Sequence, residues 1–359
     1  MTSLKEMRIL CALAACTLCF GQAPTAPVND DMPKRSDIIV QVKVVIAPTT
    51  VLDRSGNYIN GLNIDDFKLF DNNKPQKITA DVAFEPLSMV VAVQNSASLS
   101  EILPKLQKIG VMLDNMVVGQ SGEAAVMAFD HRVRMIQDFT ADAGKLDAAM
   151  KNIKPGGSSS RLIDAVTDSV RLLSKRPDNR RRVLLLIAEK RDTASEGRLR
   201  DALTAAQLAN VSIYSIDISH LVSQLTAKVE PARPDPIPAT AQHVPGGGVQ
   251  TPTSVGVQNN SGNFIPLFVD IFKASKSLFI DDTLDVFTRY TGGKEYSFVS
   301  QKSLERAVTA VGEELHSQYL LSYNPDNLEE GGFHDIRVEV NRPRLEVRTR
   351  PGYWVAARP

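Results

Sequence analysis

The chain of 359 residues lacks several features that commonly reveal a protein's chemistry. Its three cysteines, Cys11, Cys16 and Cys19, all fall near the N-terminus, so the rest of the chain can form neither an internal disulfide nor a thiolate metal site. Its 41 basic and 41 acidic residues cancel, which leaves no net charge to attract nucleic acid or an anionic membrane surface. These absences exclude thiol chemistry and disfavour nucleic acid as a partner.

The N-terminal segment has the plan of a secretory signal peptide. Lys5 and Arg8 precede the apolar run Ile9–Phe20, which is shorter than the roughly 20 residues that a membrane-spanning helix needs. Small and turn-forming residues follow, so we predict cleavage near Gly21 to Ala23 and an exported protein, periplasmic or secreted. Leu13 to Cys16 also resembles a lipobox, which leaves open a lipoprotein attached to the membrane only through a lipid anchor at Cys16.

Residues 37–84 have the pattern of a small β unit. Residues 38–46 are rich in β-branched side chains, residues 53–57 form a turn cluster, and residues 67–70 alternate between apolar and polar. Residues 319–355 return to strand patterns. We expect them to pair with the N-terminal β unit, because an isolated two-stranded hairpin is only marginally stable.

Between these terminal segments, residues 85–318 alternate buried strands with amphipathic helices. Leu87–Val93 and Val183–Ala188 are continuous apolar runs, as is typical of parallel strands covered on both faces. Apolar residues then recur at helical spacing over residues 102–116 and 162–173. The alternation predicts an α/β fold with a doubly wound, mostly parallel sheet and a small accessory β unit formed by the N- and C-terminal segments.

Residues 225–262 interrupt the alternation. They are crowded with Pro, Gly, Ser and Thr, including Gly246 to Gly248, and this composition predicts a flexible insertion. The predicted organisation is a signal peptide at 1–23, an N-terminal β unit at 37–84, an α/β domain at 85–318 that carries the insertion, and C-terminal strands at 319–355.

Short polar segments border the predicted strands and helices in a characteristic order. Gln94–Ser98 follows the first apolar strand, Gly156–Ser160 precedes the helix that starts near residue 162, and Glu189–Asp192 follows the most apolar strand. Arg348–Trp354 lies at the end of the last predicted strand pattern. In this order the segments resemble the von Willebrand factor type A (VWA) superfamily, in particular VWA-related exported proteins of Acidobacteria. The resemblance covers about residues 38–355 apart from the insertion, and it implies a VWA/Rossmann-like fold.

In VWA domains, loops at the strand ends form a metal-ion-dependent adhesion site of pattern Asp-x-Ser-x-Ser, followed by a Thr and an Asp. The resemblance places Gln94 at the first Asp, and Ser96 and Ser98 at the two serines. Ser160 then stands at the Thr, and Glu189 at the last Asp. Hard cations prefer oxygen ligands and carboxylate charge, so the amide at Gln94 predicts a degenerate site with no cofactor or with weakly bound Mg²⁺ or Mn²⁺. Such a weak metal site would use Ser96, Ser98, Ser160 and Glu189.

The resemblance also implies a function. It indicates a module that binds a protein partner, for adhesion or as a scaffold, and that is not an enzyme. Open α/β sheets bind ligands beyond the carboxyl ends of their strands. We therefore expect ligand contacts at Gln94, Asn95, Ser96, Ser98, Ser160, Glu189 and Asp192.

Other chemistry has less support in the sequence. The alternative is a cell-envelope serine hydrolase that uses Ser96, although the surrounding residues lack the glycines of a nucleophile elbow. The five histidines do not have zinc-ligand spacing, and Gln94 to Ser100 contains no glycine to admit a nucleotide phosphate. The basic cluster from Lys175 to Arg191 is expected to be a solvated loop edge rather than a site for polyanions.

Overall fold

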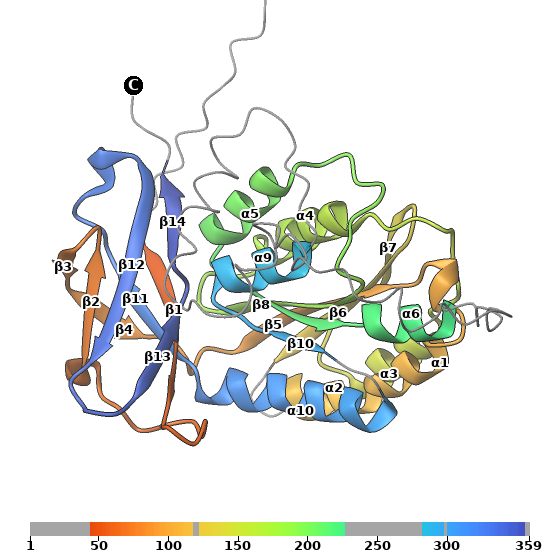
Figure 1. Ribbon diagram of the computed structural model, residues 1–359, viewed down its shortest axis with the longest axis horizontal. Helices are drawn as coiled ribbons and strands as arrows, with labels where there is room; N and C mark the ends of the chain where they lie inside the picture. The colour runs from red at the N-terminus through yellow and green to blue at the C-terminus, as the bar shows by residue number, and fades with distance from the viewer. Residues whose placement is uncertain (1–43, 118–121, 227–281, 298–299, 356–359) are drawn as a thin grey trace, which may run out of the picture. The chain divides into compact units, whose positions relative to one another are not determined.

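A computed structural model describes residues 44–117, 122–226, 282–297 and 300–355 of the chain. Figure 1 shows these residues as coloured ribbons. The predicted signal peptide, Cys16 and nearly all of the predicted insertion lie outside the described residues. The start of the predicted N-terminal β unit also lies outside them, and the first described strand is β1, Val45–Leu52.

The centre of the α/β part is a six-stranded sheet. Its spatial order is β10-β9-β8-β5-β6-β7, and every neighbouring pair is parallel except the antiparallel pair of β6 and β7. The strands are β5 (Leu87–Gln94), β6 (Glu123–Phe129), β7 (Val133–Thr140), β8 (Arg181–Ala188), β9 (Val211–Asp217) and β10 (Glu295–Ser297).

Counted from β5, the strands of this sheet lie in the order 3-2-1-4-5-6, which is the order of a doubly wound fold. The direction of winding reverses between β5 and β8, two largely apolar strands at the centre of the sheet. The predicted fold class is therefore confirmed, including the mostly parallel sheet. In such folds the reversal point opens a crevice beyond the carboxyl ends of the strands.

Helices cover both faces of this sheet (Figure 1). One hydrophobic core joins the sheet to α1, α2, α3 and α10, and a second core joins the opposite face to α4, α5 and α9. Residues 102–116, predicted as one helix, form α1, a short 3-10 turn and α2. The helices are α1 (Leu103–Leu106), α2 (Gly110–Val117), α3 (Ala143–Lys151), α4 (Leu162–Leu173), α5 (Leu199–Leu208), α6 (Ser219–Thr226), α9 (Thr283–Thr291) and α10 (Gln301–Ser317).

The accessory β unit consists of two four-stranded sheets that combine both ends of the described chain. β1 pairs with β11 and β13, and β2 pairs with β12, so strands from the two ends share one core. The first sheet contains β13 (Glu346–Thr349), β1, β11 (Tyr319–Tyr323) and β4 (Ile78–Asp81). The second contains β14 (Gly352–Val355), β12 (Gly332–Val340), β2 (Phe67–Asp71) and β3 (Lys74–Gln76).

A buried polar network around Asp71 ties these strands together. Asp71 has no solvent exposure, and it accepts hydrogen bonds from Asn327 (3.0 Å), Tyr323 (2.9 Å) and Tyr353 (2.8 Å) and pairs with His334 Nδ1 (2.7 Å). Burial alone would raise the pKa of Asp71, but the hydrogen bonds hold that pKa below its ordinary value. The charged carboxylate of Asp71 therefore links β2 to partners between residues 323 and 353, which are far from it in the sequence.

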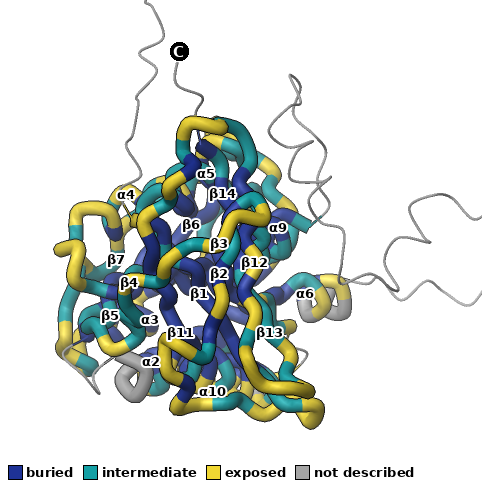
Figure 2. Tube along the Cα trace, turned by 90° about the vertical axis from the view of Figure 1, so that its left-hand side faces the viewer, coloured by how far each residue is buried: buried dark blue, intermediate teal, exposed yellow. Residues whose placement is uncertain are grey.

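The extent of burial differs between the core and the loops of the described structure. In Figure 2 the buried residues gather inside the molecule and the exposed ones mark the turns. One sequence expectation is corrected here. The basic cluster is not a solvated edge throughout, because Arg181 is only 6% exposed and both Arg176 and Arg180 form ion pairs with Glu123.

Candidate functional site

The candidate site lies where the sheet reverses its winding. Gln94 is the last residue of β5, and Glu189 directly follows β8, so both side chains leave the carboxyl ends of adjacent parallel strands. Ser96 and Ser98 occupy the turn after β5, and Ser160 precedes α4. The sequence had placed these five residues at one site, and the structure brings four of them into one hydrogen-bond cluster: Gln94, Ser96, Ser98 and Glu189.

The side-chain amide of Gln94 organises this cluster. Its Nε2 donates to Glu189 Oε2 at 2.7 Å and to Ser96 Oγ at 2.9 Å. In return, the backbone N–H of Glu189 donates to Gln94 Oε1 at 2.8 Å. Gln94 is 1% exposed, so its amide lies almost entirely out of contact with water. The amide of Gln94 thus connects the carboxyl ends of β5 and β8.

The orientation of the Gln94 amide follows from its partners. Turning it over would place Oε1 against the Glu189 carboxylate and Nε2 against the Glu189 backbone N–H, which would pair acceptor with acceptor and donor with donor. Each mismatch would leave a buried polar group unpaired at a cost of about 1–3 kcal/mol. The N–H groups of Gln94 therefore face Glu189 and Ser96.

The two serines extend the cluster toward solvent. The hydroxyl oxygens of Ser96 and Ser98 lie 3.0 Å apart, and Ser98 Oγ donates to Glu189 Oε2 at 3.4 Å. Ser96 is 1% exposed, whereas Ser98 is exposed and Glu189 is half-buried. Within the described ranges, Glu189 forms no ion pair with a lysine, arginine or histidine, so the outer part of the cluster carries an uncompensated negative charge.

Ser160 lies on the loop that packs against both strand ends. Gly156 N–H donates to Asn95 O at 2.7 Å, and Ala97 N–H donates to Gly157 O at 2.8 Å. On the other side, Ser160 N–H donates to Thr193 Oγ1 at 2.8 Å. The Ser160 hydroxyl is buried and has no hydrogen-bond partner in the described part of the chain. It is the one predicted residue at this edge whose polar group is left without a partner.

Other side chains approach two glycines of this loop closely. A Cβ on Gly156 would lie 1.8 Å from Asp130 Oδ2, and a Cβ on Gly157 would lie 2.4 Å from His131 Nδ1. Asp130 is fully buried at the end of β6 and accepts the Gly157 N–H at 2.7 Å. Asp130 therefore positions the loop that carries Ser160, a role that the sequence analysis missed.

Two predicted contact residues have other partners. Asn95 is 1% exposed, and its side-chain amide donates to Lys154 O at 2.5 Å, so it fastens the loop after α3. Asp192 accepts the backbone N–H of Ile163 at 3.2 Å and also binds Ser195, so it covers the start of α4. The structure does not bring Asn95 or Asp192 into the cluster, because both side chains satisfy backbone groups of the surrounding loops.

The cluster presents few of the ligands that a divalent cation prefers. A hard cation requires oxygen ligands, but Gln94 presents N–H groups to Ser96 and Glu189. Glu189 is the only carboxylate in the cluster. Across the described residues, no group of three or more His, Cys, Asp or Glu side chains is arranged to hold a metal ion. The hydrogen bonds of the amide link the two strand ends directly.

A second charged cluster at the same edge was not predicted. Lys190 Nζ contacts Asp282, lies 2.9 Å from Glu295 Oε1 and lies 3.9 Å from Asp217 Oδ2. Burial raises the pKa of Glu295 to about 7, and the carboxylates of Asp282 and Asp217 also raise it, while Lys190 opposes the shift. No sequence pattern indicates this cluster, since its members come from the loop after β8, from β9, from β10 and from the residue before α9.

The alternative of a serine hydrolase depends on a base next to Ser96. The Ser96 hydroxyl contacts the side chains of Gln94 and Ser98, and no histidine in the described part of the chain reaches it. No helix within the described ranges has the length and hydropathy of a membrane span.

Neither a family model nor a curated protein matches the chain. Similar solved structures include an aerotolerance-related membrane protein from Bacteroides fragilis (11% identity, TM-score 0.38, 64% of this chain and 99% of that chain). A second is BatB from Bacteroides thetaiotaomicron (13% identity, TM-score 0.38, 63% of this chain and 99% of that chain). A third is the vWF domain of the type V pili tip protein Mfa5 from Porphyromonas gingivalis (14% identity, TM-score 0.26, 30% of this chain and 39% of that chain). Likeness of this size concerns the fold alone.

Proposed function

We propose that this chain, which has a VWA-like fold, is an exported protein-binding module that acts in adhesion or as a scaffold. Its contact surface is the carboxyl edge of the sheet around β5 and β8. The doubly wound order supports this assignment, because ligands of open α/β sheets bind where the winding reverses. Export is proposed from the charged start and the apolar run Ile9–Phe20.

One observation carries the proposal for the site. The Gln94 amide satisfies Glu189 and Ser96 at the strand ends, so the loops are held in place by hydrogen bonds within the protein. A preorganised loop surface loses less conformational entropy when a partner binds. Ser98 and Glu189 remain accessible at its rim, while the inner groups of the cluster are buried.

In this proposal the module works with no cofactor, or with only weakly bound Mg²⁺ or Mn²⁺. A partner would contact the serine hydroxyls and the Glu189 carboxylate directly rather than through a cation. No described side chain is placed to act as a base on Ser96, so the proposal assigns the chain no enzyme activity.

Capture from an envelope extract of the native host tests the contact surface. Ser98→Arg adds a bulky side chain to the exposed rim of the cluster, whereas Ser55→Arg makes the same change in the exposed turn after β1. We expect the wild type and Ser55→Arg to retain the same partner and Ser98→Arg to lose it by at least about tenfold. Equal retention of the partner by all three proteins would place the contact surface elsewhere.

A further inference from the structure

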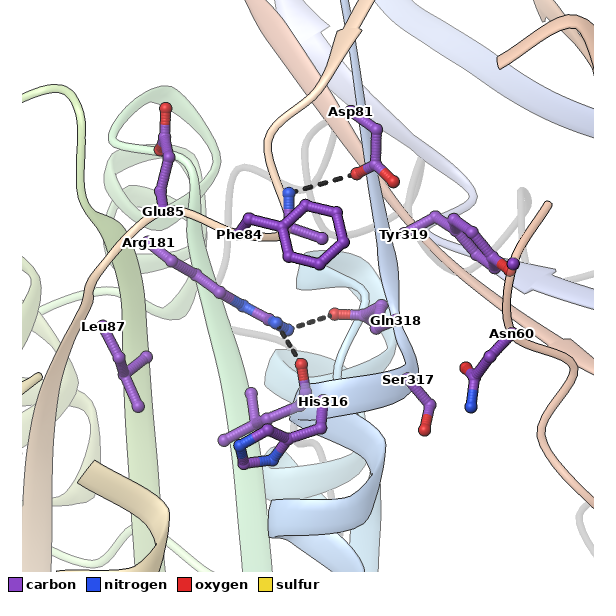
Figure 3. Close-up of a pocket in the computed structure, with 13 residues that line it drawn as sticks. Asn60, Asp81, Phe84, Glu85, Leu87, Arg181, His316, Ser317, Gln318 and Tyr319 are labelled. Carbon is purple, nitrogen blue, oxygen red and sulfur yellow. Dashed lines mark hydrogen bonds between the residues drawn. The ribbon is translucent and has the colours of Figure 1, made fainter. Parts of the chain in front are cut away.

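A cavity of about 370 Å³ lies at the opposite edge of the central sheet from the strand-end cluster. Leu87 and Arg181, the first residues of β5 and β8, line it, together with the end of α10 and the start of β11. Figure 3 shows Arg181 and Gln318 meeting in this cavity beside the ring of Phe84. The volume falls within the range of about 300–1,000 Å³ that is common for small-molecule sites.

Arg181 is a buried cation with neutral partners. Its side chain donates to Leu315 O and, at 2.8 Å, to Gln318 Oε1. Its Nε has no hydrogen-bond partner, and among the described residues Arg181 forms no ion pair. Burial lowers the pKa of Arg181, yet a guanidinium stays protonated in proteins. The carboxylates of Glu314 and Asp81 oppose that shift, but among the described residues neither forms a direct ion pair with Arg181. A guanidinium that is 6% exposed and has no directly paired carboxylate is costly, so an anion in the cavity would be stabilised.

Two carboxylates in the cavity wall restrict the kind of anion. Asp81 Oδ1 accepts the backbone N–H groups of Ala83 at 3.1 Å and Leu320 at 2.8 Å. Figure 3 shows the Glu85 side chain pointing away from the Arg181 guanidinium. These negative charges would repel a phosphate or another multiply charged ion more strongly than a single carboxylate.

The remaining wall is largely apolar. Phe84 is 85% exposed at the cavity, and Leu87 and Leu315 line it further in. An exposed aromatic ring beside a buried charge suits a ligand with one apolar end and one charged end. Ser317 and Asn60 add polar side chains to the wall.

We propose that this cavity is a second binding site, for a small monocarboxylate with an apolar body. The carboxylate would accept hydrogen bonds from the free N–H groups of Arg181, and the apolar body would lie against Phe84, Leu87 and Leu315. The site does not depend on the strand-end surface, which lies at the other ends of β5 and β8.

Calorimetric titration of the full chain with paired probes tests this site. The probes are hexanoate and benzoate, each compared with its neutral amide and with the amine of the same carbon skeleton. We expect saturable binding of the acids at least about tenfold tighter than that of their amides, because only the acids can pair with Arg181. The amines should not bind.

Variants then locate the binding. Arg181→Met should abolish the preference for acid over amide, and Phe84→Ala should weaken hexanoate about three- to tenfold. Phe84 is exposed, so this variant should fold even if Arg181→Met does not, and Met135→Ala on β7 serves as the control for a change at an exposed apolar residue. Absence of saturable binding, equal binding of acids and amides, or full affinity in Phe84→Ala would overturn the proposal.

Discussion

At the residue scale, the candidate site depends on one amide. A glutamate at position 94 would bring its carboxylate to about the 2.7 Å that now separates Gln94 Nε2 from Glu189 Oε2, and the two carboxylates would need a cation or a shared proton between them. The amide of Gln94 has one donor end and one acceptor end, and both ends have matching partners. The same pair of positions can therefore be held together by hydrogen bonds alone.

A glutamate at position 94 should expose this dependence. In Gln94→Glu two carboxylates would share the buried position, so we expect the free energy of unfolding near neutral pH to fall by about 1–3 kcal/mol. Repulsion raises the shared pKa above the unfolded value, so the lost stability should return as the pH falls and one carboxylate takes up a proton. Urea denaturation at about pH 7.5 and about pH 5 measures this.

The control for this variant is Gln137→Glu on β7, where the side-chain amide donates only to the neighbouring Asp138 carbonyl. Its unfolding free energy should change little at either pH. A loss of stability in Gln94→Glu that does not depend on pH would mean that repulsion with Glu189 is not its cause.

The sequence indicated part of the site at this scale. Gln94 and Glu189 follow two strongly apolar strands, so their proximity could be predicted from the strand pattern. The roles of Asn95 and Asp192 could not, because their partners are backbone groups of Lys154 and Ile163. The geometry of the turns decides whether a polar side chain points into the site or hydrogen-bonds to a loop. That geometry cannot be predicted from the residue type alone.

At the scale of elements, long periodic segments were predictable and short ones were not. The strands around Leu87–Val93 and Val183–Ala188 and the helix at 162–173 were predicted because continuous apolar runs and helical spacing mark buried elements. No separate strand was predicted for β3, which has three residues, or for β14, which has four. Such short strands form because neighbouring strands supply hydrogen bonds, and the pattern within them is too brief to read.

The cluster around Lys190 gives the β8–β10 edge a pH dependence. The pKa of Glu295 is about 7 in the folded protein, above its ordinary value of 4.5, so the folded protein holds this proton more tightly than the unfolded chain. This contribution to stability is complete below about pH 4.5 and is lost as the pH rises toward 7.

Glu295→Gln should remove that dependence. Between about pH 4.5 and about pH 7 the wild type should lose roughly 1 kcal/mol more unfolding free energy than the variant, after allowance for solvent screening. Thermal or urea denaturation across this range measures the difference, with the exposed Glu101→Gln as the control. Parallel pH profiles for the wild type and Glu295→Gln would contradict the assignment.

At the scale of the whole molecule, Gln318 connects the α/β part to the accessory β unit. Its Oε1 accepts from Arg181 at 2.8 Å and from the Tyr214 hydroxyl at 3.2 Å. Its Nε2 donates to Gly292 O at 2.9 Å and to Thr50 Oγ1 at 3.3 Å. These bonds fix the junction between α10 and β11, next to the proposed carboxylate cavity. They were not predictable, since they join residues that lie far apart in the sequence.

The central claim is that hydrogen bonds of Gln94, rather than a cation, hold the strand ends together. Titration calorimetry of Mg²⁺ and Mn²⁺ with the wild type, Gln94→Asp and Asn95→Asp tests it most directly. Asn95→Asp adds the same charge one residue along, where the side chain binds Lys154 O outside the cluster.

The account predicts weak or no binding by the wild type and by Asn95→Asp, and binding about ten- to a hundredfold tighter by Gln94→Asp, because a second carboxylate restores charge and oxygen ligands. Micromolar binding by the wild type that Gln94→Asp leaves unchanged would contradict the claim.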